Sequence, residues 1–259
     1  MRTLKAMMAA TLLLCGAAGA AQEEPARELE PVHVNAMRNP EVKKYKAILA
    51  GLDAFDKHHK MAPRVDKLQF RLTARRRDDL PEPLGIRLVG DDGFKLPLPI
   101  DGAGRFVVPR SEAAADADSE LELNRKRHHY RIMPDIRTPA LAANQRRLGD
   151  LRLECKVMIA IAKEEIPFYG VILINGVLLT TDWCSFFDEK KDARFGFKAD
   201  APISAAVLRH GELSVPLRVN DGSFEVAIAT PGWSDEAIVE LTFAEPPTGT
   251  AAETPRTAP

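Results

Sequence analysis

The sequence predicts an α+β protein, mainly β, built from two similar small antiparallel β-sandwich modules that are related by internal duplication. The first observation is a strand–turn–strand pattern at 213–226, which recurs at 95–108 with one extra turn residue. The second is a series of short apolar/polar alternations around both copies, separated by turn residues, as half-buried strands require. The third is an apolar spacing of three and four residues before the first copy, which is typical of an amphipathic helix.

The first 21 residues have the pattern of a secretory signal peptide. Arg2 and Lys5 precede a short apolar run at 6–14, and the small residues at 18–20 fit the cleavage rule, with cleavage one residue later equally compatible. We therefore expect a periplasmic or secreted protein. The alternative is a lipoprotein acylated at Cys15, but the leucine before this cysteine is bulkier than the small residue that such processing favours.

Residues 22–62 are expected to form a polar leader followed by one amphipathic helix at about 40–60. Asn39 suits the N-cap, Pro40 suits the first helical position, and Pro63 ends the helix. The apolar stripe of this helix consists of Val42, Tyr45, Ile48, Leu49, Leu52 and Phe55. Such a stripe has to be covered, and we expect it to pack on a face or edge of a sheet or to dock on a partner.

The first β module is expected at 63–124, the second at 195–245, and a disordered tail rich in Pro, Thr and Ala at 246–259. The matched apolar positions are Phe70 with Phe195, Leu72 with Phe197, Ile86 with Ala205, Leu88 with Val207, Leu96 with Val215, and Phe106 with Phe224. Proline cannot donate a hydrogen bond to a strand ladder, so the strand that contains Pro97 is expected at the edge of a sheet.

Residues 125–194 lie between the two modules and are expected to form a linker and a partly helical insertion. Apolar residues alternate at 151–157, which predicts a strand to about residue 156. The stretch 157–180 fits either a strand or a buried helix with a break near Pro167, and both interpretations remain open. Three charged residues at 163–165 would be costly in lipid, so no transmembrane segment is expected in the mature chain.

Removal of the signal peptide would leave two cysteines, Cys155 and Cys184. In an oxidising compartment such a pair is most simply a disulfide, and the alternative is two buried free thiols. The bridge would close a loop of about 30 residues and stabilise the fold by about 3–4 kcal/mol in the chain-entropy model. The spacing is too long for a C-x-x-C redox pair.

The basic segment 125–131 is the candidate for anion binding, with phospholipid headgroups or acidic glycans as possible targets. Its cationic candidates are Arg125, Lys126, Arg127 and Arg131, and Arg146 and Arg147 could join them in one patch. The alternative interpretation is a solvated basic loop whose charge is balanced by nearby acids.

His128 and His129 are candidates for a metal ligand or a general base. No recognised metal-binding spacing surrounds them, and no nucleophile, Walker or dinucleotide-binding motif occurs in the chain. We therefore assign no catalytic residue, no metal ion and no cofactor from the sequence. Glu164 and Glu165 are the acids whose apolar neighbours could raise a pKa, but an exposed position at the edge of the insertion is the favoured interpretation. The formal net charge of −1 gives no reason to expect nucleic-acid binding.

The segments 148–155 and 181–184 resemble stretches of small exported proteins of Gram-negative bacteria to which no function is assigned. The β modules are similar in style to immunoglobulin-like or transthyretin-like sandwiches. These resemblances imply a sandwich fold and an exported class of protein, and they imply no activity.

We expect an exported binding or scaffolding protein of the cell envelope, whose partner is a protein or another envelope component. One alternative is a hydrolase that acts on envelope material, with a site between the modules and His128 or His129 as the base. Another is an anion- or lipid-binding module that uses the segment 125–131. The absence of catalytic spacing makes an enzyme the less favoured class.

Overall fold

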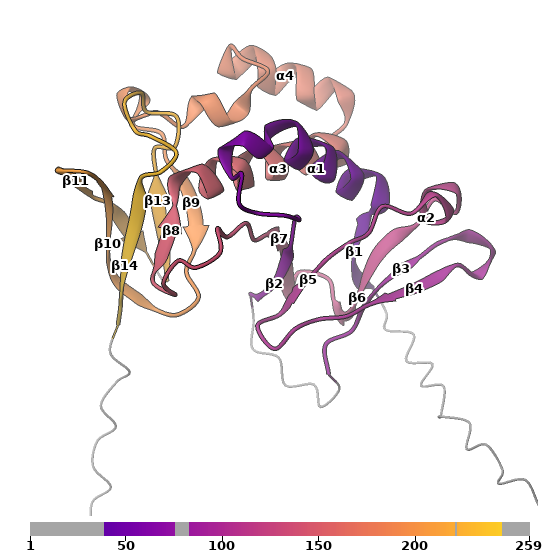
Figure 1. The fold of residues 1–259 in the computed structure, drawn as a ribbon. Helices are drawn as coiled ribbons and strands as arrows, with labels where there is room; N and C mark the ends of the chain where they lie inside the picture. The colour runs from indigo at the N-terminus through magenta and orange to yellow at the C-terminus, as the bar shows by residue number, and fades with distance from the viewer. Residues whose placement is uncertain (1–38, 76–82, 221, 245–259) are drawn as a thin grey trace, which may run out of the picture. The chain divides into compact units, whose positions relative to one another are not determined.

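The computed structural model describes residues 39–75, 83–220 and 222–244. These residues belong to one compact unit of mixed α/β structure, in which antiparallel strands form several sheets beside four α-helices (Figure 1). The predicted signal peptide at 1–21, the leader before residue 39 and the tail at 246–259 lie outside the described residues.

The strands of the first half form two antiparallel sheets. Across the four-stranded sheet the order is β1 (Pro40–Lys44), β6 (Glu120–Lys126), β3 (Ile86–Val89) and β4 (Lys95–Leu98). Across the three-stranded sheet it is β5 (Arg105–Phe106), β2 (Phe70–Ala74) and β7 (Tyr130–Pro134). The strand that contains Pro97, β4, lies at the edge of its sheet, which confirms the position expected from its proline.

The strands of the second half also form a four-stranded and a three-stranded sheet. The order of the first is β11 (Leu213–Pro216), β10 (Ile203–His210), β14 (Ile238–Phe243) and β8 (Gln145–Arg147). The order of the second is β12 (Arg218–Asn220), β13 (Ser223–Val226) and β9 (Phe195–Lys198). Because β8 pairs with β14, the segment predicted as an insertion contributes a strand to this half.

A pair of stacked phenylalanines occupies the same position in each three-stranded sheet. Phe70 on β2 lies opposite Phe106 on β5, with ring centroids 5.9 Å apart. Phe197 on β9 lies opposite Phe224 on β13, with ring centroids 5.7 Å apart. The match of Phe70 with Phe195 stays a prediction, because these pairs lie within each sheet and do not test it.

The first helix begins later than predicted. α1 spans Tyr45–His58, because the backbone of Pro40–Lys44 pairs with β6 and forms β1 instead of a first helical turn. Asn39 has a positive φ of 61° and does not cap the helix, whose N-cap position is Lys44. A short 3-10 turn at His59–Met61 follows. The buried side chains of α1 include Tyr45, Ile48, Leu52 and Phe55, which confirms most of the predicted stripe.

The predicted strand at 151–157 is part of a helix, α3, which spans Leu148–Glu165. This helix contributes to the cores of both halves. Leu153, Val157 and Ile161 belong to the core of the first half. Leu148, Leu151 and Cys155 belong to the core of the second half. Two helical stripes therefore interleave along one helix, and at 151, 153, 155 and 157 they imitate the alternation of a strand.

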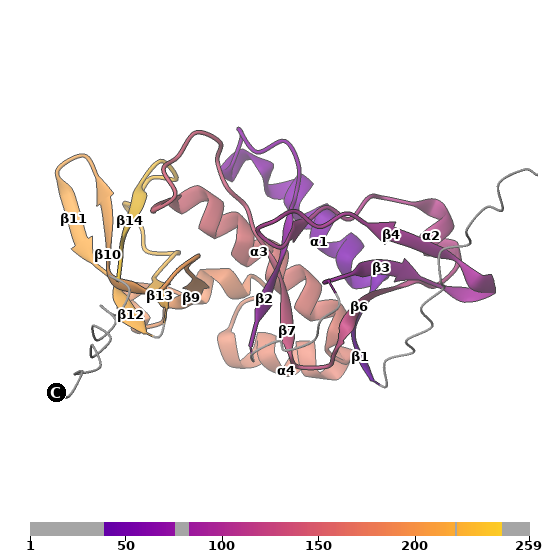
Figure 2. The same cartoon turned by 90° about the horizontal axis from the view of Figure 1, so that it is seen from below.

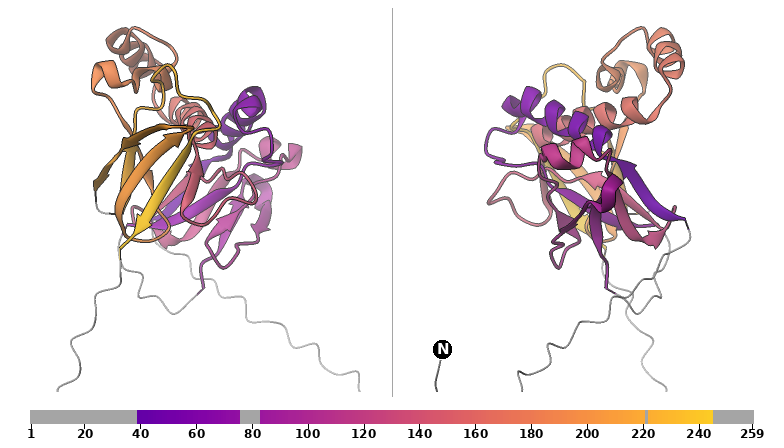
Figure 3. Two further views of the ribbon diagram at one scale, coloured as in Figure 1. Left: turned by 60° about the vertical axis from the view of Figure 1, so that its left-hand side comes forward. Right: turned by 90° about the vertical axis from the view of Figure 1, so that its right-hand side faces the viewer.

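α3 packs along α1, and both helices lie beside the strands (Figure 2). A break at Pro167 separates α3 from α4 (Phe168–Leu178), so the helical interpretation of this stretch is confirmed. The expectation of a buried helix is wrong for α4, which has no buried residue. Figure 3 shows α4 beyond α3, away from the strands. The predicted Ala/Asp linker contains a short helix, α2 (Glu112–Asp116), whose N-cap is Ser111.

Candidate functional site

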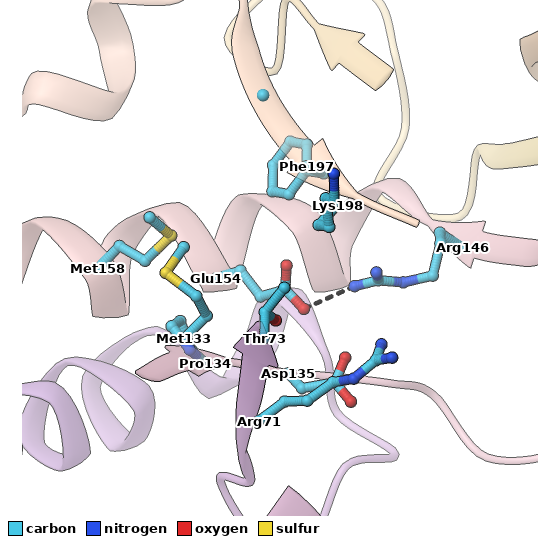
Figure 4. Close-up of a pocket in the computed structure, with 11 residues that line it drawn as sticks. Arg71, Thr73, Met133, Pro134, Asp135, Arg146, Glu154, Met158, Phe197 and Lys198 are labelled. Atoms are coloured by element: carbon cyan, nitrogen blue, oxygen red, sulfur yellow. Dashed lines mark hydrogen bonds and ion pairs between the residues drawn. The ribbon is translucent and has the colours of Figure 1, made fainter. Parts of the chain in front are cut away.

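The candidate site is a small cavity between β2, β7, β9 and α3 (Figure 4). Its volume is about 50 Å³, which is room for a small polar group. The polar side chains that line it are Arg71, Thr73, Asp135, Arg146, Glu154 and Lys198. Charged side chains are rarely buried unless they are paired, so their concentration at this point requires an explanation.

Glu154 lies in the middle of α3 and is buried. Its Oε1 accepts a hydrogen bond from the backbone N–H of Ile136 at 2.7 Å and one from the Arg146 guanidinium at 2.6 Å. Burial raises the pKa of Glu154 to about 7, although the positive charge of Arg146 opposes this effect. Glu154 therefore changes its protonation state near neutral pH.

Asp150, one helical turn before Glu154, has a related structural role. Its carboxylate accepts hydrogen bonds from the backbone N–H of Thr138 at 2.7 Å and from the hydroxyl of the same residue at 2.8 Å. Asp150 and Glu154 thus hold the segment that follows β7 against α3. Backbone N–H groups buried in a connecting segment need such acceptors, because water does not reach them.

A network of arginines and aspartates surrounds the same cavity. Asp135 pairs with Arg105 at 2.5 Å and with Arg137 at 2.9 Å. Asp200, in the loop after β9, pairs with Arg137 at 2.7 Å and also with Arg71 on β2. Strands of the first half are therefore tied to the second half through shared carboxylates.

The arginines keep both aspartates ionised. Burial alone would raise the pKa of Asp135, but the charges of Arg137 and Arg146 and the hydrogen bonds of the network lower it below its usual value. The pKa of Asp200 is lowered in the same way, against the effect of burial, by Arg137 and Arg71. Glu154 is thus the acid of this cluster that titrates near neutral pH.

Two donors of the cavity lining have no acceptor among the described residues. They are the Nε–H groups of Arg71 and Arg146, and both nitrogen atoms are buried. A buried donor without an acceptor costs about 1–3 kcal/mol, and more when the group is charged. Arg71 and Arg146 both line the cavity, so two guanidinium groups with a spare donor border whatever occupies it.

The basic segment predicted to bind anions forms the end of β6, a turn and the start of β7. Arg125 is buried, and its guanidinium donates to the backbone and side-chain oxygens of Asn124. Lys126, Arg127 and Arg131 are exposed. An exposed basic patch at this hairpin would consequently have to form without Arg125.

The two histidines of the same hairpin lie outside the cavity lining. His128 has a positive φ of 69°, and its backbone N–H donates to the Glu41 carboxylate at 2.6 Å. The backbone N–H of His129 closes the turn onto the carbonyl of Lys126. In the part of the chain that the structure describes, no group of three or more His, Cys, Asp or Glu side chains is arranged to hold a metal ion.

Glu164 and Glu165 are exposed, which confirms the favoured interpretation of these two acids. Glu164 and Glu165 lie at the end of α3 and form ion pairs with Lys46 at 3.0 Å and Lys43 at 2.5 Å. Burial raises the pKa of two acids earlier on this helix, Asp150 and Glu154, and that of Glu154 to about 7. The predicted strand at 151–157 hides this pair; on a helix, Asp150 and Glu154 share one face at a spacing of four, which indicates a paired acidic site.

The disulfide between Cys155 and Cys184 is confirmed, with Cα atoms 6.0 Å apart. It joins α3 to the chain that returns from α4. Near it, the indole N–H of Trp183 donates to the side-chain oxygen of Asn175 on α4 at 2.7 Å. Lys163 donates to the carbonyl of Thr181 at 2.6 Å. The disulfide and the Lys163–Thr181 hydrogen bond fix the chain after α4 to α3, and the chain itself joins the start of α4 to α3 at Pro167.

α4 itself presents a second candidate surface. Its outward side is apolar, where a helix of a globular protein is ordinarily polar. The large apolar residues exposed there are Phe168, Tyr169, Ile172, Leu173, Val177 and Leu179. The stretch Phe168–Phe186 also satisfies the length and composition of a membrane span, with 11% of it buried. α4 alone has only 11 residues, and the rest of that stretch includes Asp182 and a 3-10 turn.

Comparisons with known proteins add no relationship: the chain matches no protein-family model, no curated protein and no solved structure.

Proposed function

We propose that this chain is an exported binding or scaffolding protein of the cell envelope that attaches to the lipid surface through α4. The observation that carries the proposal is the apolar outward side of this helix. Phe168 is 79% exposed and Leu179 is 90% exposed, and the residues between them leave no charged group on this side. Contiguous exposed apolar surface of this kind marks an interaction site.

A lipid leaflet fits the dimensions of α4. An 11-residue helix is about 16 Å long, which is about half of the roughly 30 Å hydrocarbon thickness of a bilayer. The chain carries no charged residue from 166 to 181, so the whole helix can enter an apolar medium. Asn175 is its one polar amide, and it is already paired with Trp183. A helix that is too short to span can still be buried in one leaflet.

The attachment of α4 to the fold supports the same function. The disulfide and the Lys163–Thr181 hydrogen bond hold the chain after α4 against α3, and the start of α4 follows α3 directly in the chain. The exposed side chains are therefore presented on a fixed support and do not have to be ordered on binding, which lowers the entropic cost of association. A bridge of this kind requires an oxidising compartment, which agrees with the proposed export.

The proposal includes an internal duplication of the fold. In each half an outer strand of the four-stranded sheet leads directly into a long helix, β1 into α1 and β8 into α3. The strand orders β1-β6-β3-β4 and β8-β14-β10-β11 correspond, and so do the stacked phenylalanine pairs. Superposition of β1–α1 on β8–α3 should bring the two phenylalanine pairs together, and a superposition that leaves them apart would refute the duplication.

The alternative of an envelope-directed hydrolase has weaker support. It required a site between the halves with His128 or His129 as base, and neither side chain lines the cavity. Glu154 is a proton donor or acceptor near neutral pH, but its carboxylate is engaged by Ile136 and Arg146. These contacts are those of a positioned structural acid, and we propose no reaction for it.

Sedimentation with lipid vesicles tests the attachment. The chain without residues 1–21 is mixed with vesicles of phosphatidylethanolamine and phosphatidylglycerol, and the bound fraction is measured. Replacing Leu173 and Val177 by Glu should weaken binding at least about tenfold, because each charge would have to enter the hydrocarbon. Leu213→Glu is the matched control, since Leu213 is an exposed apolar residue on β11. Equal binding by all three chains, or no binding by the unmodified chain, would refute the proposal.

A further inference from the structure

The cavity between the two halves is a candidate ligand site that does not depend on the lipid-binding surface of α4. Arg146 is almost fully buried, and its Nε–H has no acceptor among the described residues. The buried Nε–H of Arg71 is in the same situation, and both side chains line the same cavity. Two unused guanidinium donors at one small volume indicate that an oxygen-bearing or anionic group belongs there.

The balance of charges around the cavity also favours a bound anionic group. The ion-pair network contains four arginines, namely Arg71, Arg105, Arg137 and Arg146. It contains three carboxylates, those of Asp135, Asp200 and Glu154. Four positive charges against three negative charges leave one positive charge in excess, and two when Glu154 is protonated. Excess charge in a partly buried cluster is costly unless a counter-charge is bound.

The cavity also adjoins a larger groove. This groove has a volume of about 470 Å³ and shares Thr73, Met133, Phe197 and Lys198 with the cavity lining. Its further lining includes Arg75 and Arg131, so it is basic. β7 and β9, which border it, are the outer strands of their sheets. An outer strand offers backbone hydrogen-bonding groups to an extended chain that lies beside it.

We propose that the cavity binds the carboxylate of a ligand, whose remaining atoms lie in the adjoining basic groove. A carboxylate presents two oxygens in one plane, which suits the two guanidinium groups of Arg71 and Arg146 that line the cavity. A tetrahedral phosphate would bring more oxygens than the cavity has unused donors, and about 50 Å³ favours the smaller group. The ligand is either a small free carboxylate or the carboxyl terminus of an extended peptide.

Binding is measured with three probes on the chain without residues 1–21: sodium acetate, trialanine with a free carboxyl group, and trialanine amide. The readout is the chemical shift of the arginine Nε–H resonances together with calorimetric titration. Acetate or free trialanine should bind and shift these resonances, and trialanine amide should bind at least about tenfold more weakly. Free trialanine binding tighter than acetate identifies a peptide terminus, and equal binding identifies a small carboxylate.

Two variants make the assignment specific. Arg71→Lys and Arg146→Lys keep the positive charge and remove the Nε–H, and each should weaken carboxylate binding at least about tenfold. Arg87→Lys on β3, where Arg87 pairs with Glu122 outside the cavity, is the control and should leave binding unchanged. Arg146→Lys could disturb folding. The Arg71→Lys variant and the Nε–H resonances of the unmodified protein therefore test carboxylate binding independently of it. No shift with any probe, or equal binding of the acid and the amide, overturns the proposal.

The attachment through α4 and the carboxylate site can be refuted independently of each other. A variant of Arg71 changes the cavity and leaves the α4 surface intact, so its vesicle binding should be unchanged. Loss of vesicle binding with retained carboxylate binding would refute the attachment through α4 alone.

Discussion

Arg146 on β8 and Glu154 on α3 form a 2.6 Å ion pair whose side chains are only 4% and 6% exposed. The two residues come from elements that follow each other directly, and the carboxylate is shared with the backbone N–H of Ile136. A buried ion pair is weak as a source of stability, but the loss of one partner leaves an uncompensated charge. The pair therefore makes the stability of the fold sensitive to the protonation of Glu154.

The first prediction concerns the pH dependence of unfolding. The pKa of Glu154 is raised in the folded state to about 7, so the folded protein binds a proton that the unfolded chain releases near its ordinary value. The contribution to stability is present at low pH and is lost as pH rises through 7. Between pH 6 and pH 8 the free energy of unfolding should fall by about 1 kcal/mol from this group.

Chemical denaturation at a series of pH values measures this fall. Glu154→Gln should remove most of it, because glutamine accepts the same hydrogen bonds and does not titrate. Glu164→Gln, at the partly exposed end of α3, is the control and should retain the unmodified pH profile. An identical profile for Glu154→Gln would contradict the assignment of the raised pKa.

The second prediction couples this proton to the proposed carboxylate site. The charged groups that face the cavity are Arg71 from β2, Asp135 after β7, Arg146 from β8, Lys198 from β9 and Glu154 itself. Protonation of Glu154 adds one unit of positive charge to this set. Acetate should therefore bind at least about threefold more tightly at pH 6 than at pH 8. Calorimetric titration at both values measures the ratio, and Glu154→Gln should abolish it.

The third prediction concerns the disulfide. Replacing Cys155 and Cys184 by Ser should lower the free energy of unfolding by about 3–4 kcal/mol, because the unfolded chain regains the entropy of a long open loop. The α4 segment should also become a preferred site of proteolysis, since one of its two ends is then released from α3. Reduction of the unmodified protein should reproduce both effects, whereas a reductant should leave the double variant unchanged.

The fourth prediction compares two glycines in helices. A Cβ at Gly149, in the first turn of α3, would lie 2.1 Å from the backbone carbonyl oxygen of Met61. Gly149→Ala should therefore destabilise the fold by about 2–3 kcal/mol, since a backbone atom has to move. A Cβ at Gly176 on α4 meets no atom within 4 Å. Gly176→Ala should be neutral or stabilising by up to about 1 kcal/mol in thermal unfolding. The reverse order would contradict the packing of α3 against Met61.

Much of the β structure was predictable because it depends on local alternation and turn chemistry. The strands around Phe70, Ile86 and Leu96 and their counterparts in the second half lie where the alternation placed them. The predictions of secondary structure were wrong in two segments, where tertiary contacts differ from what the local pattern indicates. α3 contributes side chains to two cores, and its two apolar stripes together imitate the alternation of a strand. Pro40–Lys44 carry the signals of a helix start, but their backbone pairs with β6. Tertiary pairing outweighs local propensity in both places.

The candidate site was less predictable than the fold. The signal for Glu154 is its spacing of four from Asp150, which has meaning only once the segment is known to be helical. Arg71 and Arg146 lie far apart in the sequence and meet at one cavity only because the fold brings β2 and β8 to its border. The sequence marks the segment at 125–131 as basic, but burial removes Arg125 from any exposed patch.

By itself, the sequence determined the series of short strands and their turns, the edge position of the strand with Pro97, the apolar stripe of α1 and the pairing of Cys155 with Cys184. These features follow from side-chain periodicity, proline chemistry and the count of cysteines, all of which act locally or by elimination. Only the tertiary structure decided that α3 contributes to two cores, that burial raises the pKa of Glu154 to about 7, and that α4 turns its apolar side outward. Burial and charge pairing depend on which segments of the chain contact each other in the folded protein, and a local sequence pattern does not specify these contacts.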